Sequence, residues 1–306
     1  CSDATPFQSP HWLIPWYRHL NPGALWVIAL RDRERVSALA PFFIGEGDRG
    51  ERCLSLAGTG VSDYLDVLFS PDSVAPAETL FRFLDSRHGF WDSCDFRQLR
   101  ACSLLLHPLS SWHDQVAADE PCPVLELDPT ASAGSSRLDK NLRYCAARAE
   151  KLGEFVIEPA AEQNLEAWLR ALFELHGLRW RRRGEPGVLC DQNVRAFHAE
   201  VARFAAEAKI LRGYAVRING EIAAAYYGFA DRARAYYYLG GFNPRYAALS
   251  PGLLAIRHAI SEAAAEGRKE FDFLRGQEAY KYRFGARDRP CYRRRIRPRL
   301  TWRPRA

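Results

Sequence analysis

The chain lacks the sequence patterns of several large enzyme classes. Its 306 residues contain no H-E-x-x-H, no G-x-S-x-G and no Walker loop, and candidate metal ligands do not cluster. These absences argue against a metallohydrolase, a serine hydrolase and a P-loop NTPase, and they predict no metal site. No apolar run approaches the ~20 residues that span a bilayer, and no secretory signal is visible at the start. We therefore expect a cytoplasmic protein without a transmembrane segment.

Methionine is absent altogether, and the sequence begins at Cys1. This combination leads us to expect a fragment or a processed form, with a lipid-modified Cys1 as an alternative. The eight cysteines form no C-x-x-C pair. Their irregular spacing predicts reduced thiols that pack as small apolar residues, and neither a disulfide framework nor a zinc site.

Lysine is scarce, because only 5 of the 43 basic residues are Lys. The charge is also uneven: residues 281–306 hold eleven Lys or Arg and the single acid Asp288, a net charge of +10 within a chain of net +6, so the other residues sum to −4. Such an end suits the phosphates of a nucleotide, a tRNA or an acidic membrane surface. An arginine-rich solvated surface is the alternative.

Strand and helix patterns alternate along the chain and predict an α/β protein with a mixed sheet. In the first part, which 121–128 closes, we expect helices at 9–19 and 77–87 and strands at 25–30, 36–44, 52–57, 64–69, 93–99 and 103–107. In the second part we expect helices at 137–151, 161–178, 193–208 and 253–266 and strands at 155–158, 210–218, 221–229, 235–239 and 270–274. Both halves mix hairpins with helices, which predicts two related domains at 1–130 and 161–306, joined by a linker and basic helix at 131–160.

The segment 234–286 carries the most functional information. An aromatic strand leads through a glycine-containing turn into a helix and then into a second strand, which is the order of a βαβ unit. Backbone N–H groups at such a helix start favour an anion. Ser250 as N-cap and Pro251 as first helical residue are equally consistent with an ordinary helix start.

Several motifs resemble the GNAT acyltransferase superfamily, and in particular its FemAB-like and CelD-like branch, bacterial GNAT-type N-acetyltransferases. The matching residues are Tyr236-Tyr-Tyr-Leu-Gly-Gly-Phe242, Ser250-Pro-Gly252, Glu270-Phe-Asp-Phe-Leu-Arg-Gly276, Glu278-Ala-Tyr-Lys-Tyr-Arg-Phe-Gly285, Leu175-His176, Arg179-Trp180, Gly184, Phe197-His198 and Phe7-Gln8-Ser9 with Trp12. The resemblance implies a tandem GNAT-like acyl-CoA N-acyltransferase fold. It also implies acyl-CoA, acetyl-CoA above all, as a co-substrate and no permanently bound cofactor.

In GNAT enzymes the aromatic strand separates from its neighbour and pairs with the pantetheine arm of the donor. The resemblance implies that this strand is 235–241 here. It implies donor-binding roles for Tyr237, Leu239, Gly240, Arg245, Ser250 and Gly252. The helix-start loop departs from the usual Q/R-x-x-G-x-G/A pattern, since Gly252 is the single glycine between Arg245 and the helix.

Three residues are candidates for catalysis. Asp272 is a carboxylate on an apolar strand, which suits a general base or an amine ligand; a structural acid paired with Arg275 or Lys281 is the alternative. His176 ends an apolar helix, where a structural histidine is the alternative. Tyr238 is a candidate proton donor to the leaving group, although most strand tyrosines pack in a core.

The expected acceptor site lies between the domains, near His176, Asp272 and Lys281. Its candidate ligands are Arg179, Trp180, Tyr280, Lys281 and Arg283. Lys281 and Arg283 suit a phosphate or carboxylate, or else form a solvated face.

Together these features predict transfer of an acyl group from acyl-CoA to an amine or hydroxyl of a small molecule or of a lipid- or sugar-linked precursor. The resemblance to the family implies that such a precursor belongs to the envelope or to a polysaccharide. One alternative is aminoacyl transfer from tRNA, favoured by the basic helix and the basic end. The other is a non-catalytic assembly module in polysaccharide biosynthesis. Nothing points to DNA, and the oligomeric state stays open.

Overall fold

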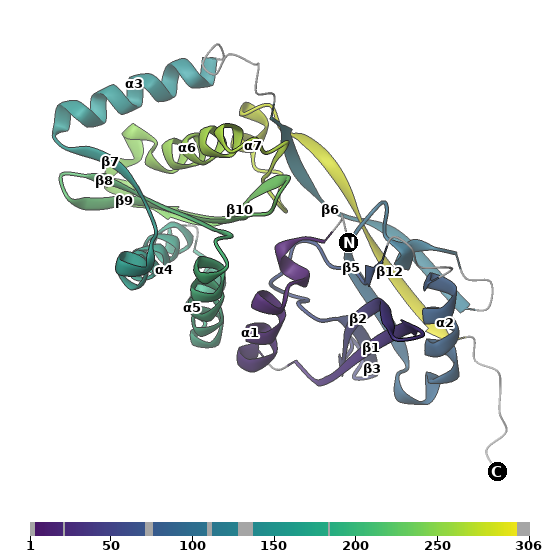
Figure 1. Ribbon diagram of the computed structural model, residues 1–306. Helices are drawn as coiled ribbons and strands as arrows, with labels where there is room; N and C mark the ends of the chain where they lie inside the picture. Colours follow the sequence, from purple (N-terminus) through teal and green to yellow (C-terminus); the bar gives the residue numbers. More distant parts are fainter. Residues whose placement is uncertain are drawn as a thin grey trace. The chain divides into compact units, whose positions relative to one another are not determined.

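The computed structural model describes residues 4–20, 22–70, 76–108, 112–127, 137–182 and 184–298 (Figure 1). The chain divides into two compact units, Cys1–Pro121 with Pro290–Ala306, and Cys122–Arg289. The boundaries that we expected at 130, 131 and 160 stay predictions. Residues 131–136 of the predicted linker lie outside the described residues, whereas β7 (Phe155–Pro159), in its later part, pairs along its length with β8 (Leu211–Ile218) of the second unit.

The first unit is built on a sheet ordered β1-β2-β3-β5-β12-β6. Its elements are α1 (Pro10–Leu20), β1 (Ala24–Asp32), β2 (Arg35–Glu46), β3 (Arg52–Leu56), β4 (Leu68–Phe69), α2 (Pro76–Ser86), β5 (Ser93–Arg100), β6 (Trp112–Glu126) and β12 (Arg287–Pro298). Strands β6 and β12 carry residues of both units. The parallel pair β3–β5 is connected through α2. Alternate residues of the strands, such as Phe42, Leu54 and Phe96, are buried and form the core of this unit with Leu80 and Leu84 of α2.

A buried ion pair ties the last strand into the first unit. The Arg294 side chain on β12 is 0% exposed, and its guanidinium binds the Asp114 carboxylate on β6 and the carbonyl oxygens of Leu105 and His107. A buried guanidinium is tolerated only when it is paired and hydrogen-bonded in this way.

The second unit is built on a sheet ordered β6-β11-β10-β9-β8-β7. Its further elements are α3 (Arg137–Leu152), α4 (Leu165–Arg181), α5 (Gln192–Glu207), β9 (Glu221–Ala230), β10 (Arg234–Phe242), α6 (Pro251–Ala265), β11 (Glu270–Asp272) and α7 (Ala279–Arg283). Helices α3, α6 and α7 lie on one face of this sheet, and α4 and α5 lie on the other (Figure 1). The predicted Asn219-Gly220 hairpin turn is confirmed, with φ of 50° and 76°.

The two units share one plan. In the first, three antiparallel strands β1-β2-β3 are followed by a helix and by β5, parallel to β3. In the second, β8-β9-β10 are followed by α6 and by β11, parallel to β10. The prediction of a mixed α/β sheet in two related units is therefore confirmed.

Two local predictions are wrong. The segment 103–107 is not a strand: Leu104–Leu106 form a 3₁₀ turn, and the Ser103 hydroxyl accepts a hydrogen bond from the Leu105 N–H at 3.1 Å. Of the expected strand 64–69, only Leu68–Phe69 pair with a neighbour. In both cases the apolar run was too short for periodicity to decide its conformation. Further 3₁₀ turns are Pro6–Gln8, His88–Phe90, Glu162–Asn164, Val188–Cys190 and Pro244–Leu249.

The backbones of β10 and α4 approach each other closely at Gly241. A Cβ atom placed on Gly241 would lie 2.3 Å from the backbone nitrogen of His176 and 2.4 Å from the carbonyl carbon of Leu175. Both obstructing groups are backbone atoms, so only glycine fits without moving the helix from the sheet.

We expect Gly241→Ala to lower the free energy of unfolding by about 2 kcal/mol, because the added methyl overpacks the contact between β10 and α4. Gly177→Ala is the matched control. It lies in α4, where the new methyl meets only the flexible end of Arg181, and it should raise stability by about 0.5–1 kcal/mol. Urea unfolding measures both. Equal stability of the two variants would contradict the close approach.

Candidate functional site

Strand β11 leaves its parallel partner β10 after three residue pairs. The register runs from Arg234 opposite Glu270 to Tyr236 opposite Asp272, whereas β10 continues to Phe242. Asp272 ends β11, because its Oδ1 accepts the Leu274 N–H at 2.9 Å and Leu274 adopts a left-handed φ of 57°. Within the described ranges, the edge of β10 beyond Tyr236 has no strand beside it on this side, which leaves a wedge in the sheet.

The segment after β11 is held by the ammonium group of Lys281. This side chain is 2% exposed, and its Nζ donates to the carbonyl oxygens of Leu274, Arg275 and Gly276 at 3.2, 2.5 and 2.9 Å. Nζ also lies 3.0 Å from a carboxylate oxygen of Glu278. These contacts fix the start of α7 against the turn that follows β11, and so fix the position of Tyr280.

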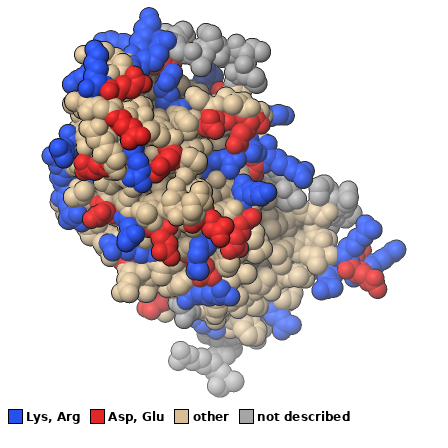
Figure 2. Space-filling model, turned by 60° about the vertical axis from the view of Figure 1, so that its left-hand side comes forward, with Lys and Arg blue, Asp and Glu red and all other residues tan. Residues whose placement is uncertain are grey.

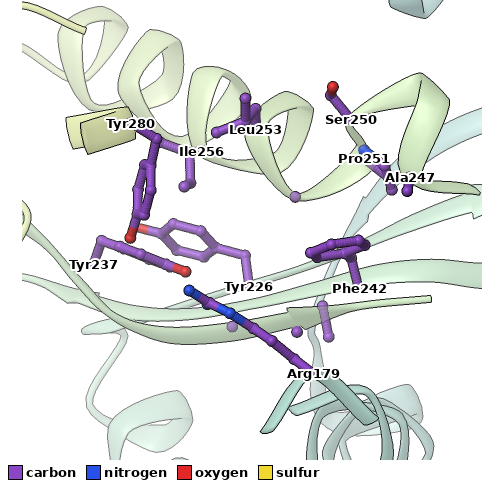
Figure 3. Close-up of a pocket in the computed structure, with 14 residues that line it drawn as sticks. Arg179, Tyr226, Tyr237, Phe242, Ala247, Ser250, Pro251, Leu253, Ile256 and Tyr280 are labelled. Carbon is purple, nitrogen blue, oxygen red and sulfur yellow. The ribbon is translucent and has the colours of Figure 1, made fainter. Parts of the chain in front are cut away.

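A cavity of about 280 Å³ lies between this part of the sheet and α6. Tyr226 on β9 and Tyr237 on β10 stack at 5.0 Å between ring centroids, and Tyr280 of α7 lies beside them (Figure 3). Phe242 and the α6 residues Leu253 and Ile256 contribute further large apolar side chains to the cavity wall. The other lining residues are Arg179, Ala225, Gly240, Gly241, Ala247, Ser250, Pro251 and Gly252.

A bulge at Tyr238 decides which β10 residues face the cavity. Tyr237 pairs with Gly228 and Leu239 pairs with Tyr227, so Tyr238 is an extra residue in the strand. After the bulge, the even-numbered residues of β10 face the cavity in place of the odd-numbered ones, so that Gly240 and Phe242 line it. Tyr238 lies on the opposite face, 5.3 Å from the His198 ring and 5.7 Å from the Tyr227 ring.

Arg179 is the one charged side chain among the described residues that line the cavity. It extends from the last turn of α4 toward the rings of Tyr226 and Tyr237 (Figure 3). Burial raises the pKa of the Tyr237 hydroxyl, and the Arg179 charge offsets part of this rise. Burial, then the neighbouring Tyr237 and Glu278, also raise the pKa of Tyr280. Both phenols are therefore protonated at neutral pH, beside a guanidinium.

The structure brings six of the predicted site residues to the cavity, namely Arg179, Tyr237, Gly240, Ser250, Gly252 and Tyr280. The lining does not include Asp272, His176, Tyr238, Leu239, Arg245, Trp180, Lys281 or Arg283. Sequence reasoning missed Tyr226, Phe242 and Ile256. The aromatic pair Tyr226-Tyr227 on the strand next to β10 was the available signal for the first of these.

Two of the residues outside the lining already have structural partners. The Asp272 carboxylate is 0% exposed and, besides the Leu274 N–H, accepts from Arg289 at 3.2 Å. Arg245 is exposed and lies 3.4 Å from Glu221. In the parts of the chain that are described, no group of His, Cys, Asp or Glu side chains is arranged to hold a metal ion, and no helix is long and apolar enough to cross a bilayer.

The start of α6 offers fewer anion donors than the sequence suggested. Ser250 has a left-handed φ of 51° and makes no side-chain cap, and its hydroxyl points away from the aromatic rings (Figure 3). Its carbonyl oxygen accepts the N–H groups of both Leu253 and Leu254 at 3.0 and 3.1 Å. Pro251 has no N–H to donate. The cavity is therefore defined by its aromatic walls and Arg179 more than by this helix start.

His176 lies beneath the sheet with its side chain 4% exposed. Its Nε2 accepts the Trp180 indole N–H at 2.8 Å, and no hydrogen-bond partner of its Nδ1 is found among the described residues. Burial, and then the charge of Arg179, lower the pKa of His176 to about 4. Burial, and then His176, lower that of His198 to about 3. Both imidazoles are neutral at pH 7.

These two histidines should make stability depend on pH. In the unfolded chain both imidazoles become protonated below about pH 6.5, whereas in the folded chain they stay neutral down to about pH 4 (His176) and pH 3 (His198). The free energy of unfolding therefore decreases as the pH falls through this window. The slope should reach about 2.7 kcal/mol per pH unit between pH 6 and 4. Replacing one of the two histidines, as in His176→Asn, should halve this slope of stability against pH.

Urea unfolding at several pH values measures this slope. His88→Gln is the control, because His88 is exposed, and it should leave the slope unchanged. A wild-type stability that is flat from pH 6.5 to 4 would contradict the neutral buried state.

Comparison with known proteins agrees with this geometry. Residues 136–282 match the family model described as "Acetyltransferase (GNAT) domain". The chain is similar in structure to FemX, with a TM-score of 0.64 at 10% identity over 94% of this chain and 91% of that chain. It is also similar to L-PGS from Bacillus licheniformis, with a TM-score of 0.62 at 14% identity over 94% and 91%.

A third similar structure is the C-terminal domain of a putative lysylphosphatidylglycerol synthetase from Agrobacterium fabrum, with a TM-score of 0.59 at 13% identity over 93% of this chain and 89% of that chain. The sequence matches no curated protein. Identities this low establish the fold alone. Together with the match of residues 136–282 to the GNAT domain model, they show that the chain has the GNAT fold.

Proposed function

We propose that the protein transfers an acyl group from acyl-CoA to an amine, with the donor thioester bound in the cavity between β10 and α6. The observation that carries this proposal is the wedge between β10 and β11. Among the described residues no strand lies along this edge of β10 beyond Tyr236, directly beside the aromatic cavity. Backbone edges of this kind bind extended ligands by adding a strand.

The cavity supplies groups that suit the two negative charges that develop in the reaction, one on the thioester carbonyl oxygen and one on the leaving sulfur. The amine nitrogen attacks the thioester carbonyl carbon, a C–N bond forms, and the C–S bond breaks to release the thiol of CoA. Arg179 stabilises negative charge on the carbonyl oxygen, since a fixed cation in an apolar cavity acts strongly on developing charge. Tyr237 and Tyr280 are protonated phenols, which suits one of them to protonate the leaving thiolate.

We assign removal of the amine proton to Glu278. Its side chain is 41% exposed, although one carboxylate oxygen lies 3.0 Å from Lys281 Nζ. Burial raises the pKa of both Tyr237 and Tyr280, and the charge of Glu278 adds to this. Asp272 is less suited to this task, because it is 0% exposed and an approaching amine cannot reach it. We assign to Asp272 the role of ending β11, and to His176 and Trp180 the positioning of the α4 turn that carries Arg179. The acceptor we propose is an amine on a small molecule or on a lipid- or sugar-linked envelope or polysaccharide precursor.

Gly252→Phe should weaken donor binding. Gly252 lines the cavity, and a Cβ atom added there meets Phe242 only at an ordinary 3.7 Å, so the backbone accepts a side chain. A phenylalanine ring would then fill the cavity. We expect at least a tenfold loss of acyl-CoA affinity, about 1.4 kcal/mol or more, with little change in the unfolding midpoint of the free protein.

Thermal shift and calorimetric titration with acetyl-CoA and longer acyl-CoAs measure this effect, because a ligand of the native state raises the midpoint. Gly252→Ala is the matched control and should bind as the wild type does. The absence of any shift of the wild type at millimolar acyl-CoA would overturn the thioester donor. Equal binding by the Phe variant would move the donor out of this cavity.

Helix α3 favours aminoacyl-tRNA as a second candidate donor. Its solvent-facing side carries Arg137, Lys140, Arg143, Arg148 and Lys151. On the same helix, Tyr144 is 63% exposed and the Arg148 guanidinium lies 5.7 Å from its ring. An aromatic ring among cations suits a nucleic acid. Figure 2 shows Lys and Arg interspersed with Asp and Glu over most of the face in view, so we confine this candidate to α3. Charged tRNA belongs in the same screen, where binding that weakens steeply with salt would favour it.

A further inference from the structure

The strand β1 forms an open edge in the first unit. In the described part of the chain it pairs with β2 alone, over nine residues from Ala24 to Asp32. Edge strands usually carry lysine, proline or a central bulge, which prevent pairing with other chains. The first seven residues, ALWVIAL, have none of these, and the one irregularity in register falls at Leu30/Arg31, near the end.

Both faces of β1 are apolar, although only one is covered. Ile28 is 7% exposed and belongs to the core, and Trp26 and Leu30 pack against that core. On the other face Leu25 and Val27 are 45% and 48% exposed. On β2 the neighbouring apolar side chains Val36 and Leu39, which pair with Arg31 and Ala29, are 51% and 36% exposed on the same face. On the core-facing side, the Phe90 ring, which stacks on Trp26, is 56% exposed. Exposed apolar side chains gathered on one face of a sheet edge mark an interaction site.

We propose that two copies of this chain pair through β1, antiparallel and centred on Ile28, to join two sheets across a twofold axis. In this register Leu25 lies opposite Arg31 of the partner subunit, and Trp26 lies opposite Leu30 of the partner subunit. Val27 lies opposite Ala29 of the partner subunit. The sequence of β1 is self-complementary in this arrangement, because its apolar centre meets itself, and a twofold interface requires such a match.

Charge and side-chain direction select this register. In a parallel pairing Arg31 and Asp32 would each face their own copies, whereas the antiparallel pairing places them at opposite ends of the interface. Residues directly opposite each other point to the same side of a sheet. Centring on Ile28 therefore aligns the core-facing residues of both copies and uses all nine positions. A shift by one residue would place core-facing residues opposite solvent-facing ones.

A charge exchange at Leu25 tests the pairing. Leu25→Arg and Leu25→Glu remove the same apolar side chain at an exposed position, so they should affect the monomer equally. In the dimer, residue 25 of each subunit faces Arg31 of the partner subunit, which gives two equivalent contacts. Leu25→Arg makes both contacts repulsive, and Leu25→Glu makes both attractive. We expect the wild type to sediment at twice 34.8 kDa. We expect Leu25→Arg to dimerise about tenfold more weakly than Leu25→Glu, and Leu25→Arg with Arg31→Glu to regain the affinity.

Sedimentation equilibrium over about a hundredfold range of concentration measures these affinities, and far-UV circular dichroism checks that each variant is folded. A wild type that stays monomeric throughout would overturn the proposal and leave the edge to a strand of another protein. A dimer that is equally strong in both Leu25 variants would also overturn it, since the contact would then lie elsewhere.

Discussion

The geometry of the candidate site depends on the buried ammonium of Lys281. Its hydrogen bonds to three successive carbonyl oxygens, of Leu274, Arg275 and Gly276, satisfy acceptors that would otherwise be buried and unpaired at considerable cost. Asp272 does the same for an N–H group on the same turn. With both in place, β11 ends early, the edge of β10 stays open, and α7 presents Tyr280 to the cavity. A positive charge that looks suited to a substrate thus serves chiefly to build the site.

The cavity combines aromatic walls with a single cation. Tyr226, Tyr237 and Tyr280 are neutral, so the charge that the described lining itself supplies is the positive charge of Arg179. Such a charge favours a transition state in which negative charge develops on an oxygen. The bulge at Tyr238 contributes by bringing Gly240 to the cavity side, where a Cβ atom would lie 2.8 Å from the Ala225 carbonyl oxygen and 3.0 Å from the Tyr237 hydroxyl.

Much of the fold follows from local patterns, whereas the site does not. Helices α3 to α6, most strands of the second unit and the Asn219-Gly220 turn lie where periodicity and turn chemistry predicted them, since these depend on near neighbours. The short helix α7, which carries Tyr280, was not predicted. The partners of Asp272 and Lys281 depend on a turn that is invisible in the sequence, and a charged residue in an apolar segment suggests chemistry as readily as structure. The bulge changes which side chains face the cavity, and no local signal marks it. The sequence suggested Ser250 as an N-cap, whereas its left-handed φ and missing cap hydrogen bond depend on the tertiary structure.

The buried contact between Arg294 and Asp114 has a consequence for biosynthesis. These residues lie 180 positions apart in the sequence, and the whole second unit, Cys122–Arg289, is made between them. During translation the second unit has all its strands before β12 emerges from the ribosome. Until then the first unit has no strand between β5 and β6, and Asp114 has no guanidinium to pair with. Contacts so distant form late, so the half-built first unit is the stage at which a nascent chain would most need a chaperone.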